Sequence, residues 1–242
     1  MSNQVQKNSE KPHCETCASR SLGVFCDLEN AEVASLDLQK ISNKYKKGQT
    51  LFYQGNPPFG IFCISHGKIK ISHVGLDGKE SILRIVSDGD ILGHRSLFSE
   101  ENYSATATVL EDSTVCFIDK KFILKAIKDY PSIAVNLITK LSKDMGSAEN
   151  RISSMSQKNV RERFAELILG LRESFSKKDK DGREVLDIKL SREERASMIG
   201  VANETLIRFM SEFKDDGLIE QEGKTIIIGD VEKLKETANL LY

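Results

Sequence analysis

The sequence lacks an excess of charge of either sign, because its 35 Lys and Arg residues are matched by 36 Asp and Glu residues. The resulting net charge of −1 gives no indication of a nucleic-acid partner, so any sign of one must be local. The chain also lacks an apolar run of the roughly 20 residues that span a bilayer. Its first residues, Met1 to Pro12, are polar and contain no signal-peptide core. These absences predict a cytoplasmic protein without a membrane partner.

Cysteine is scarce, and its five occurrences are unevenly spread. Cys14, Cys17 and Cys26 lie close together near the start, whereas Cys63 and Cys116 lie inside apolar stretches. Structural disulfides are unusual in the reducing cytosol, where clustered thiols more often bind a metal or act as redox groups. The first three cysteines are therefore candidates for such chemistry, while Cys63 is interpreted as a small buried hydrophobe.

Short apolar segments separated by turn residues predict a β-rich region from about residue 45 to residue 119. The predicted strands are 50–53, 60–64, 68–74, 81–86, 106–110 and 113–118. A spacing of roughly 8–12 residues between strands is typical of a sandwich or barrel. The chain has 242 residues, which leaves room for a second domain after this region.

A helical period replaces the β pattern after Pro131, a residue that the first turn of a helix tolerates. The helix is predicted to extend to about Ser156. Apolar residues follow along it in alternating steps of four and three, the heptad spacing of a coiled coil: Leu141, Met145, Ala148, Ile152 and Met155. We interpret this seam as a dimerisation surface. The alternative is an ordinary amphipathic helix that packs on its own domain.

The remaining segments predict a winged helix-turn-helix. In order, they are a helix over 159–174, a charged loop over 176–182, a helix from Ser191 to Gly200, a helix over 203–215 and a β-hairpin over 218–228. Ser191 and Glu194 have the spacing of a capping box, which opens a helix. Two short helices joined across Gly200 and followed by a hairpin are typical of a DNA-binding module.

Several short stretches in both regions fit one family pattern when taken in order. They are Lys47–Phe52 with Gly55, Gly67–Lys70, Gly89–Gly93, Tyr103–Ala107, Leu190–Gly200, and Asn203–Thr205 with Arg208. Together they resemble the CRP/FNR family of bacterial transcription regulators, over the chain from Cys14 to about Ile228. The resemblance implies an α+β fold with a jelly-roll-like β-roll sensor of the cyclic-nucleotide-binding-domain type, a long dimerisation helix and a C-terminal winged helix-turn-helix. The implied parts are a cysteine-containing segment (1–28), the sensor (29–125), the dimerisation helix (126–157) and the DNA-binding domain (158–242).

The family's recognition helix corresponds to the helix that begins at Asn203. That helix carries a Glu-Thr pair and an Arg four residues after the Glu, which Glu204 and Arg208 match. Residues four apart share one helix face, so these two are expected to pair. In a major groove an Arg can donate two hydrogen bonds to guanine, and a Glu can accept one from cytosine. We therefore assign base reading to Glu204 and Arg208.

Neighbouring residues are assigned to supporting contacts with DNA. Asn203 is a natural adenine reader, whereas Ile207 can only touch a thymine methyl group. Three further residues are assigned to phosphate contacts, which position a protein without specifying sequence: Ser191, Thr205 and Lys224. Ala202 stands where a Ser or Thr usually caps the recognition helix, and the loss of that cap costs about 1 kcal/mol.

Two inputs to the sensor compete, and the first is a cyclic nucleotide. That branch of the family places a Glu after the roll glycine and an Arg before the roll serine. Here His94 follows Gly93, and Tyr103 precedes Ser104, so both charged anchors are missing. A buried phosphate without a cation is costly, although Arg95 or backbone N–H groups near Ser104 remain as substitutes. We expect these positions to be a residual pocket, with cyclic nucleotide disfavoured as the ligand.

The second input is an iron–sulfur cluster, as in the cysteine-bearing FNR branch. Cys14, Cys17, Cys26 and Cys116 match the ligands of that branch in order, which implies a [4Fe–4S] cluster held by four thiolates. The eight residues between Cys17 and Cys26 make a longer loop than in the type member, and His13 is a substitute ligand. Zinc at these cysteines, a thiol redox switch or no ligand at all are the alternatives.

These features predict a homodimeric transcription regulator that binds double-stranded DNA at a two-fold symmetric site and contacts RNA polymerase. Its signal is predicted to be oxygen, nitric oxide or another redox input. A regulatory subunit that does not bind DNA is a rival class. An enzyme is not expected, since the sequence contains no HExxH motif, P-loop, nucleophile elbow or nucleotide-binding glycine fingerprint.

The DNA-binding part is not basic, because residues 159–216 contain 12 Lys and Arg residues and 13 Asp and Glu residues. Since phosphate contacts dominate DNA affinity, binding requires that the charges be segregated. The cations expected to face DNA are Arg192, Arg195, Arg208 and Lys224. The acidic residues expected to face away are Glu212, Asp215 and Asp216.

Overall fold

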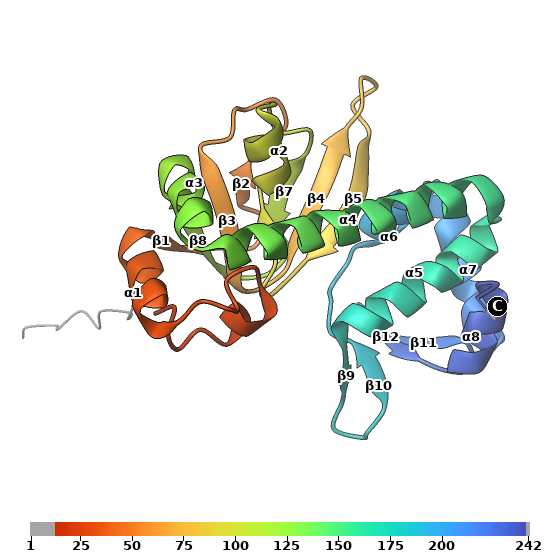
Figure 1. Cartoon of the computed structure of the whole chain (residues 1–242). Coiled ribbons are helices and arrows are strands. Elements are labelled where there is room, and N and C mark those ends of the chain that lie inside the picture. The colour runs from red at the N-terminus through yellow and green to blue at the C-terminus, as the bar shows by residue number, and fades with distance from the viewer. Residues whose placement is uncertain (1–12, 241–242) are drawn as a thin grey trace, which may run out of the picture. The chain divides into compact units, whose positions relative to one another are not determined.

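The computed structural model of the chain describes residues 13–240, which divide into two compact units (Figure 1). The first unit comprises the chain up to Ile71 together with Ile85–Ser142, and the second comprises Ser72–Arg84 together with the chain from Lys143. Residues 1–12, the polar stretch without a signal-peptide core, and residues 241–242 lie outside the described residues. Within the described chain, no helix is long and apolar enough to cross a bilayer.

Eight short strands form the predicted β-roll as two four-stranded sheets. In strand order, one sheet contains β1 (Ile41–Tyr45), β8 (Ser113–Asp119), β3 (Gly60–His66) and β6 (Ile91–Leu92). The other contains β2 (Thr50–Phe52), β7 (Thr106–Val109), β4 (Ile69–Val74) and β5 (Glu80–Val86). Alternating apolar residues such as Ile64, Ile69 and Val115 fill the interior. Gly60 begins β3 where an added Cβ would collide with the carbonyl oxygen of Ile118, so glycine allows β3 and β8 to pair there.

The N-terminal segment packs on the roll. It contains a short 3-10 helix, η1 (Ala18–Leu22), and a helix, α1 (Asn30–Gln39), neither of which the sequence pattern predicted. Val24, Phe25 and Leu36 of this segment join Ile61 and Ile118 of the roll in one buried apolar cluster. This packing determines where the three cysteines of the segment lie.

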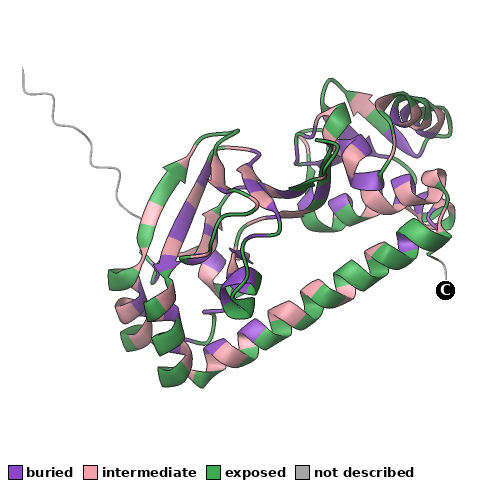
Figure 2. Cartoon of the chain, turned by 90° about the horizontal axis from the view of Figure 1, so that it is seen from above, coloured by how far each residue is buried: buried purple, intermediate pink, exposed green. Residues whose placement is uncertain are grey.

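Three helices follow or interrupt the roll: α2 (His94–Ser99), α3 (Lys120–Asp129) and α4 (Pro131–Gln157). The long helix α4 begins at the predicted proline and runs for 27 residues without interruption. Its apolar residues Ile133 and Leu137 are buried in the first turns, but much of the helix is exposed (Figure 2). The predicted long helix is therefore present, together with an exposed face that needs explanation.

The second unit contains the predicted winged helix-turn-helix. Its helices are α5 (Val160–Phe175), α6 (Arg192–Ile199), α7 (Asn203–Asp215) and α8 (Val231–Thr237). Its sheet has the strand order β11 (Ile219–Glu222), β12 (Thr225–Ile228), β10 (Glu184–Leu186) and β9 (Ser176–Lys178). Phe164 of α5 and Phe213 of α7 are fully buried, with ring centroids 4.7 Å apart, and Leu206 and Leu234 are buried with them.

The charged loop predicted over 176–182 is wrong in part, because Ser176–Lys178 forms the strand β9. β9 pairs with β10, with Lys178 opposite Glu184 and Ser176 opposite Leu186. All three residues of β9 are exposed, so the strand shows no alternation of apolar residues that a sequence pattern would reveal. The pairing depends instead on the neighbouring strand.

Candidate DNA-binding surface and thiol cavity

The helix-turn-helix consists of α6 and α7, and local hydrogen bonds define both ends of its turn. Ser191 is the N-cap of α6: its hydroxyl accepts from the backbone N–H of Glu194 at 3.1 Å, and the Glu194 carboxylate accepts from the N–H of Ser191 at 2.8 Å. Gly200 ends α6 in the left-handed conformation at φ 70°. The predicted capping box and glycine turn are thus confirmed. The turn ends α6, so that α7 begins as a separate helix.

The recognition helix α7 has one buried face and one exposed face. Leu206, Met210 and Phe213 are buried. On the opposite side Glu204 and Arg208 are exposed, and Ile207 is 48% exposed. The remaining predicted contacts on this helix, Asn203 and Thr205, are half-buried. The structure therefore presents the two predicted base readers and Ile207 together on the outer face of α7.

Arg208 does not make the predicted ion pair. Among the described residues it pairs with Glu212, at 3.7 Å, rather than with Glu204, and its guanidinium lies 5.0 Å from the centre of the Phe209 ring. The partner Glu212 lies one turn further along the same helix, so the spacing rule was correct but the direction was wrong. An ion pair at this distance between exposed side chains contributes little, which leaves the Arg208 guanidinium available for a ligand.

Two acidic residues near α7 are engaged by Arg161 of α5. Its guanidinium donates to Glu212 at 3.1 Å and to Asp216 at 2.5 Å, and it also lies over the Phe213 ring. The hydrogen bond from Arg161 lowers the pKa of Asp216. These contacts neutralise two of the three acidic charges that were expected to face away from DNA.

The prediction that Arg195 faces DNA is wrong. Its side chain is buried, with 3% of the residue exposed, and it donates to the carbonyl oxygen of Leu190 at 2.9 Å. Burial lowers its pKa. Arg192 and Lys224 are exposed as expected, and Lys224 follows Gly223 at the turn of the β11–β12 hairpin. Arg195 supports α6 from within, so its charge is not offered to phosphate.

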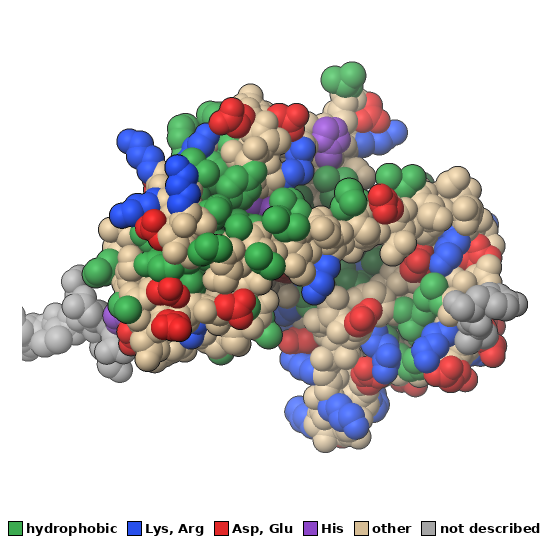
Figure 3. All heavy atoms as spheres, in the orientation of Figure 1, with side chains coloured by type: hydrophobic (Ala, Val, Ile, Leu, Met, Phe, Trp, Pro, Cys, Tyr) green, Lys and Arg blue, Asp and Glu red, His purple; other side chains and the backbone are tan. Residues whose placement is uncertain are grey.

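The predicted dimerisation seam lies largely exposed on α4. Met145 is 62% exposed, Ile152 is 69% exposed, Met155 and Ala148 are also exposed, and Leu141 is half-buried. Exposed apolar side chains follow the course of this helix in the space-filling view (Figure 3). The stripe also extends one heptad toward the N-terminus, to Ile138, and the exposed Val135 lies three residues before it; neither residue was in the predicted seam. An apolar stripe of this length is uncovered within a single protomer.

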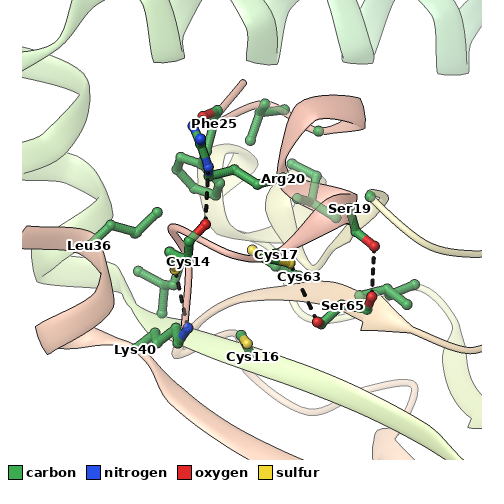
Figure 4. A pocket seen from close by; sticks show the side chains of 16 residues that line it. Cys14, Cys17, Ser19, Arg20, Phe25, Leu36, Lys40, Cys63, Ser65 and Cys116 are labelled. Atoms are coloured by element: carbon green, nitrogen blue, oxygen red, sulfur yellow. Dashed lines mark hydrogen bonds between the residues drawn. The ribbon is translucent and has the colours of Figure 1, made fainter. Parts of the chain in front are cut away.

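Four cysteines line one cavity of about 50 Å³ in the first unit (Figure 4). Cys14 and Cys17 come from one turn, in which the N–H of Cys17 donates to the carbonyl oxygen of Cys14 at 3.4 Å. Cys63 and Cys116 come from β3 and β8, where they lie directly opposite each other. Cys26 is not part of this set.

The predicted ligand set is therefore brought together only in part. Cys26 is exposed, and the amide of Asn136 on α4 donates to its sulfur at 3.6 Å. In its place the cavity contains Cys63, which the sequence analysis interpreted as a buried hydrophobe. As the side chains stand, no group of three or more His, Cys, Asp or Glu residues in the described chain is positioned to hold a metal ion. All-thiol donor chemistry nevertheless suits an iron–sulfur cluster or zinc.

Lys40 and Arg20 both line this cavity, and Lys40 contacts a thiol directly. The Nζ of Lys40 donates to the sulfur of Cys14 at 3.2 Å and pairs with Asp37 at 2.7 Å. Burial raises the pKa of Cys14 to about 11, although the hydrogen bond from Lys40 opposes that shift. Burial likewise raises the pKa of Cys63 and Cys116. These raised pKa values keep Cys14, Cys63 and Cys116 neutral at pH 7. His13, the substitute ligand, instead bonds to Asp37 at 2.9 Å.

Comparison with known proteins decides the family. A model described as a cyclic nucleotide-binding domain matches residues 42–130, and one described as a Crp-like helix-turn-helix domain matches residues 162–237. The chain belongs to the CRP/FNR family. Its relatives are transcription regulators, so this family member is a DNA-binding transcription regulator and not an enzyme.

Three relatives of this CRP/FNR protein span most of its length. The CRP-like cAMP-activated global transcriptional regulator of Mycobacterium tuberculosis is 28% identical over 89% of this chain and 96% of its own. The fumarate and nitrate reduction regulatory protein of Escherichia coli is 26% identical over 97% and 93%, respectively. A solved CRP/FNR-family regulator from Thermus thermophilus shares the fold, with a TM-score of 0.68 and 23% identity over 82% of this chain and 98% of its own.

Tyr103, which the family resemblance aligns with the phosphate anchor of the cyclic-nucleotide branch, is an aromatic residue in this CRP/FNR chain. Tyr103 is buried and stacks on Phe52, with centroids 3.9 Å apart, and burial raises its pKa to about 12. It lies next to Gly93, the left-handed N-cap of α2, while Ser104 is exposed. Arg95, the candidate substitute cation, is exposed and donates to Glu101 at 3.1 Å.

Proposed function

We propose that this regulator acts as a homodimer on double-stranded DNA with a two-fold symmetric site. The observation that carries the proposal is the exposed face of α7, with Glu204, Ile207 and Arg208 outward from an intact helix-turn-helix. In this role Arg208 donates to guanine, Glu204 accepts from cytosine, and Asn203 reads a flanking base. Three residues contact phosphate: Ser191, Thr205 and Lys224.

The apolar stripe on α4 supports the homodimer. A second copy of the same helix supplies the matching heptad surface, and a two-fold axis then relates two copies of α7. Such a dimer reads two half-sites one helical turn apart. The signal in the sensor acts on the seam from Leu141 to Met155, which sets the spacing of the two recognition helices. The regulator works in the cytoplasm and passes its output to RNA polymerase.

The signal proposed is a redox, oxygen or nitric-oxide input at the cysteines. Cys14, Cys17 and Cys116 line one cavity, so three of the four predicted cluster ligands are available from the same place. These thiolates would hold a [4Fe–4S] cluster, which would supply a group sensitive to oxygen and nitric oxide, and Lys40 would offset the negative charge of the thiolates. Zinc and free thiols at the same cysteines are the alternatives.

Control by a cyclic nucleotide is a second candidate because the first relative is named as cAMP-activated and the roll matches a cyclic nucleotide-binding domain model. Tyr103 and His94 at the anchor positions speak against it, since neither is a permanent cation or anion. Titration calorimetry of the full chain with cAMP and cGMP distinguishes the two inputs. Binding in the micromolar range would favour the nucleotide over the thiols.

The DNA-binding proposal is tested by selecting duplexes from a random pool with the full-length protein. Arg208→Ala is expected to lose about 1–3 kcal/mol of affinity for the selected site, with relaxed preference at one base pair. Lys214→Ala, an exposed cation in the last turn of the same helix, is the matched control. Failure to enrich any sequence, or wild-type affinity for Arg208→Ala, contradicts the assignment.

A further inference from the structure

The two N-terminal thiols are each positioned against a strand that carries another thiol. The sulfur of Cys17 is 3.5 Å from the hydroxyl oxygen of Ser65, which is two residues along β3 from Cys63. Residues two apart on a strand face the same side of the sheet. Cys17 and Cys63 therefore lie next to each other in the lining of the cavity, as Figure 4 shows.

Cys14 is connected to the strand pair that carries Cys116 through Lys40. Lys40 donates to the sulfur of Cys14 and immediately precedes β1, whose Ser42 lies opposite Cys116 on β8. Because Cys63 and Cys116 are directly opposed in an antiparallel pair, their Cα atoms are about 4.5–5.5 Å apart. One turn and one strand pair thus each direct two sulfurs into a single cavity.

Cys26 is held outside that cavity by contacts on both sides. The Asn136 amide donates to the carbonyl oxygen of Val24 at 3.2 Å and to the Asp27 carboxylate at 2.8 Å, in addition to the Cys26 sulfur. The side chains of Val24 and Phe25 are buried in the apolar cluster. To bring Cys26 to the other thiols, the chain would have to break these bonds and expose part of the cluster.

We propose that Cys63, and not Cys26, completes a four-thiolate metal site with Cys14, Cys17 and Cys116. The inference rests on the proposed metal-dependent signal and names its ligands. The site suits a thiophilic metal centre, either an iron–sulfur cluster or zinc. Metal binding releases the thiol protons and draws together four sulfurs that already face one cavity.

The test is metal content after anaerobic purification of the full-length protein and three single variants: Cys63→Ala, Cys26→Ala and Cys116→Ala. Iron, acid-labile sulfide and zinc per chain are measured, and sulfide with iron distinguishes a cluster from zinc. Cys63→Ala and Cys116→Ala are expected to lose at least about 90% of the metal, as for a lost ligand. Cys26→Ala is expected to keep the wild-type content. Retention by Cys63→Ala, or loss by Cys26→Ala, overturns the assignment.

A measurement on the wild-type protein covers the case in which Cys63→Ala does not fold. The metal-loaded protein is alkylated with iodoacetamide, and modified cysteines are identified by mass spectrometry. Cys26 is expected to react while the four cavity cysteines are protected, and protection of Cys26 overturns the inference. Wild-type protein that binds neither iron nor zinc would contradict the metal-dependent signal itself. Metal retained by Cys63→Ala would contradict only the role of Cys63 as a ligand.

Discussion

Three arginines of the second unit differ in role although their chemistry is the same. Arg208 is exposed on α7, whereas Arg195 is buried and donates to a backbone carbonyl. Arg151 of α4 donates to the carbonyl oxygens of Leu83, Ile82 and Met198 at 2.7–2.9 Å. The residue type alone does not distinguish a DNA contact from a structural one, because the packing of the helices decides that Arg195 is buried and Arg208 is exposed.

Tyr103 gives a prediction about pH. Its folded-state pKa is about 12 against an ordinary 10, so the stability gained by burying the neutral phenol is full below pH 10 and is lost as pH rises toward 12. Between pH 8 and pH 11 the free energy of unfolding should fall in the wild type by about 1 kcal/mol more than in Tyr103→Phe. Urea unfolding at both pH values measures this. The exposed Tyr53→Phe is the control, and equal losses in wild type and Tyr103→Phe would contradict the prediction.

The uncapped start of α7 gives a second prediction at this scale. Ala202 is the N-cap, its backbone is extended at φ −71° and ψ 154°, and no side chain caps the helix there. Ala202→Ser should raise the free energy of unfolding by about 1 kcal/mol, because the hydroxyl can accept a hydrogen bond from the N–H of Thr205. Thermal unfolding checks this. Ala202→Gly, which lacks a side-chain acceptor, is the comparison, and an equal gain there would rule out capping as the cause.

Among the elements, α4 shows how much a heptad pattern determines. The pattern predicted a long helix and an apolar stripe, and both are present. The helix pattern does not say what covers the stripe, because the side chains from Val135 to Met155 that form it are largely exposed. Dimerisation therefore remains a prediction of this element.

Ile152→Asp tests that prediction. A charge on the seam in each protomer should weaken the dimer by more than about tenfold, since burial of an Ile contributes about 2 kcal/mol and a buried unpaired carboxylate is costly. Sedimentation velocity at micromolar concentration measures the mass. Ser153→Asp, at the adjacent exposed position, should stay dimeric. A monomeric wild type, or a dimeric Ile152→Asp, would remove the seam from the proposal.

At the scale of the whole molecule, the balanced charge is resolved by local contacts. Arg161 engages Glu212 and Asp216, while Arg208, Arg192 and Lys224 remain exposed. In a chain with a net charge of −1, these exposed cations are the ones that we expect to meet phosphate. DNA affinity should then depend on a few contacts for each protomer.

The salt dependence of DNA binding measures those contacts. The slope of log K against log salt is negative, and each phosphate contact removed reduces its magnitude by about 1. Lys224→Ala should therefore reduce that magnitude by about 2 for a dimer. The slope is measured by fluorescence anisotropy with a selected duplex at salt concentrations from about 50 to about 200 mM. Lys128→Ala, on α3 of the first unit, is the control. An unchanged slope would remove Lys224 from the phosphate contacts.

Local sequence patterns were sufficient to predict the order of the structural parts and the family. Local periodicity and turn residues predict the roll strands, the long helix and the two short helices, because nearest neighbours dominate those patterns. The capping box at Ser191 and the left-handed turn at Gly200 are local as well, and both are present. The family resemblance rested on such stretches, which is why it was confirmed.

Which thiols share a cavity and which arginines are exposed could not be predicted from local patterns. Cys63 meets Cys116 because β3 pairs with β8 across more than 50 residues of chain, and Cys26 is excluded because α4 supplies Asn136. Arg195 is buried because α6 packs against α7, and β9 is a strand because β10 lies beside it. The meeting of Cys63 with Cys116 and the exclusion of Cys26 depend on contacts between residues more than 50 positions apart, which no local pattern contains.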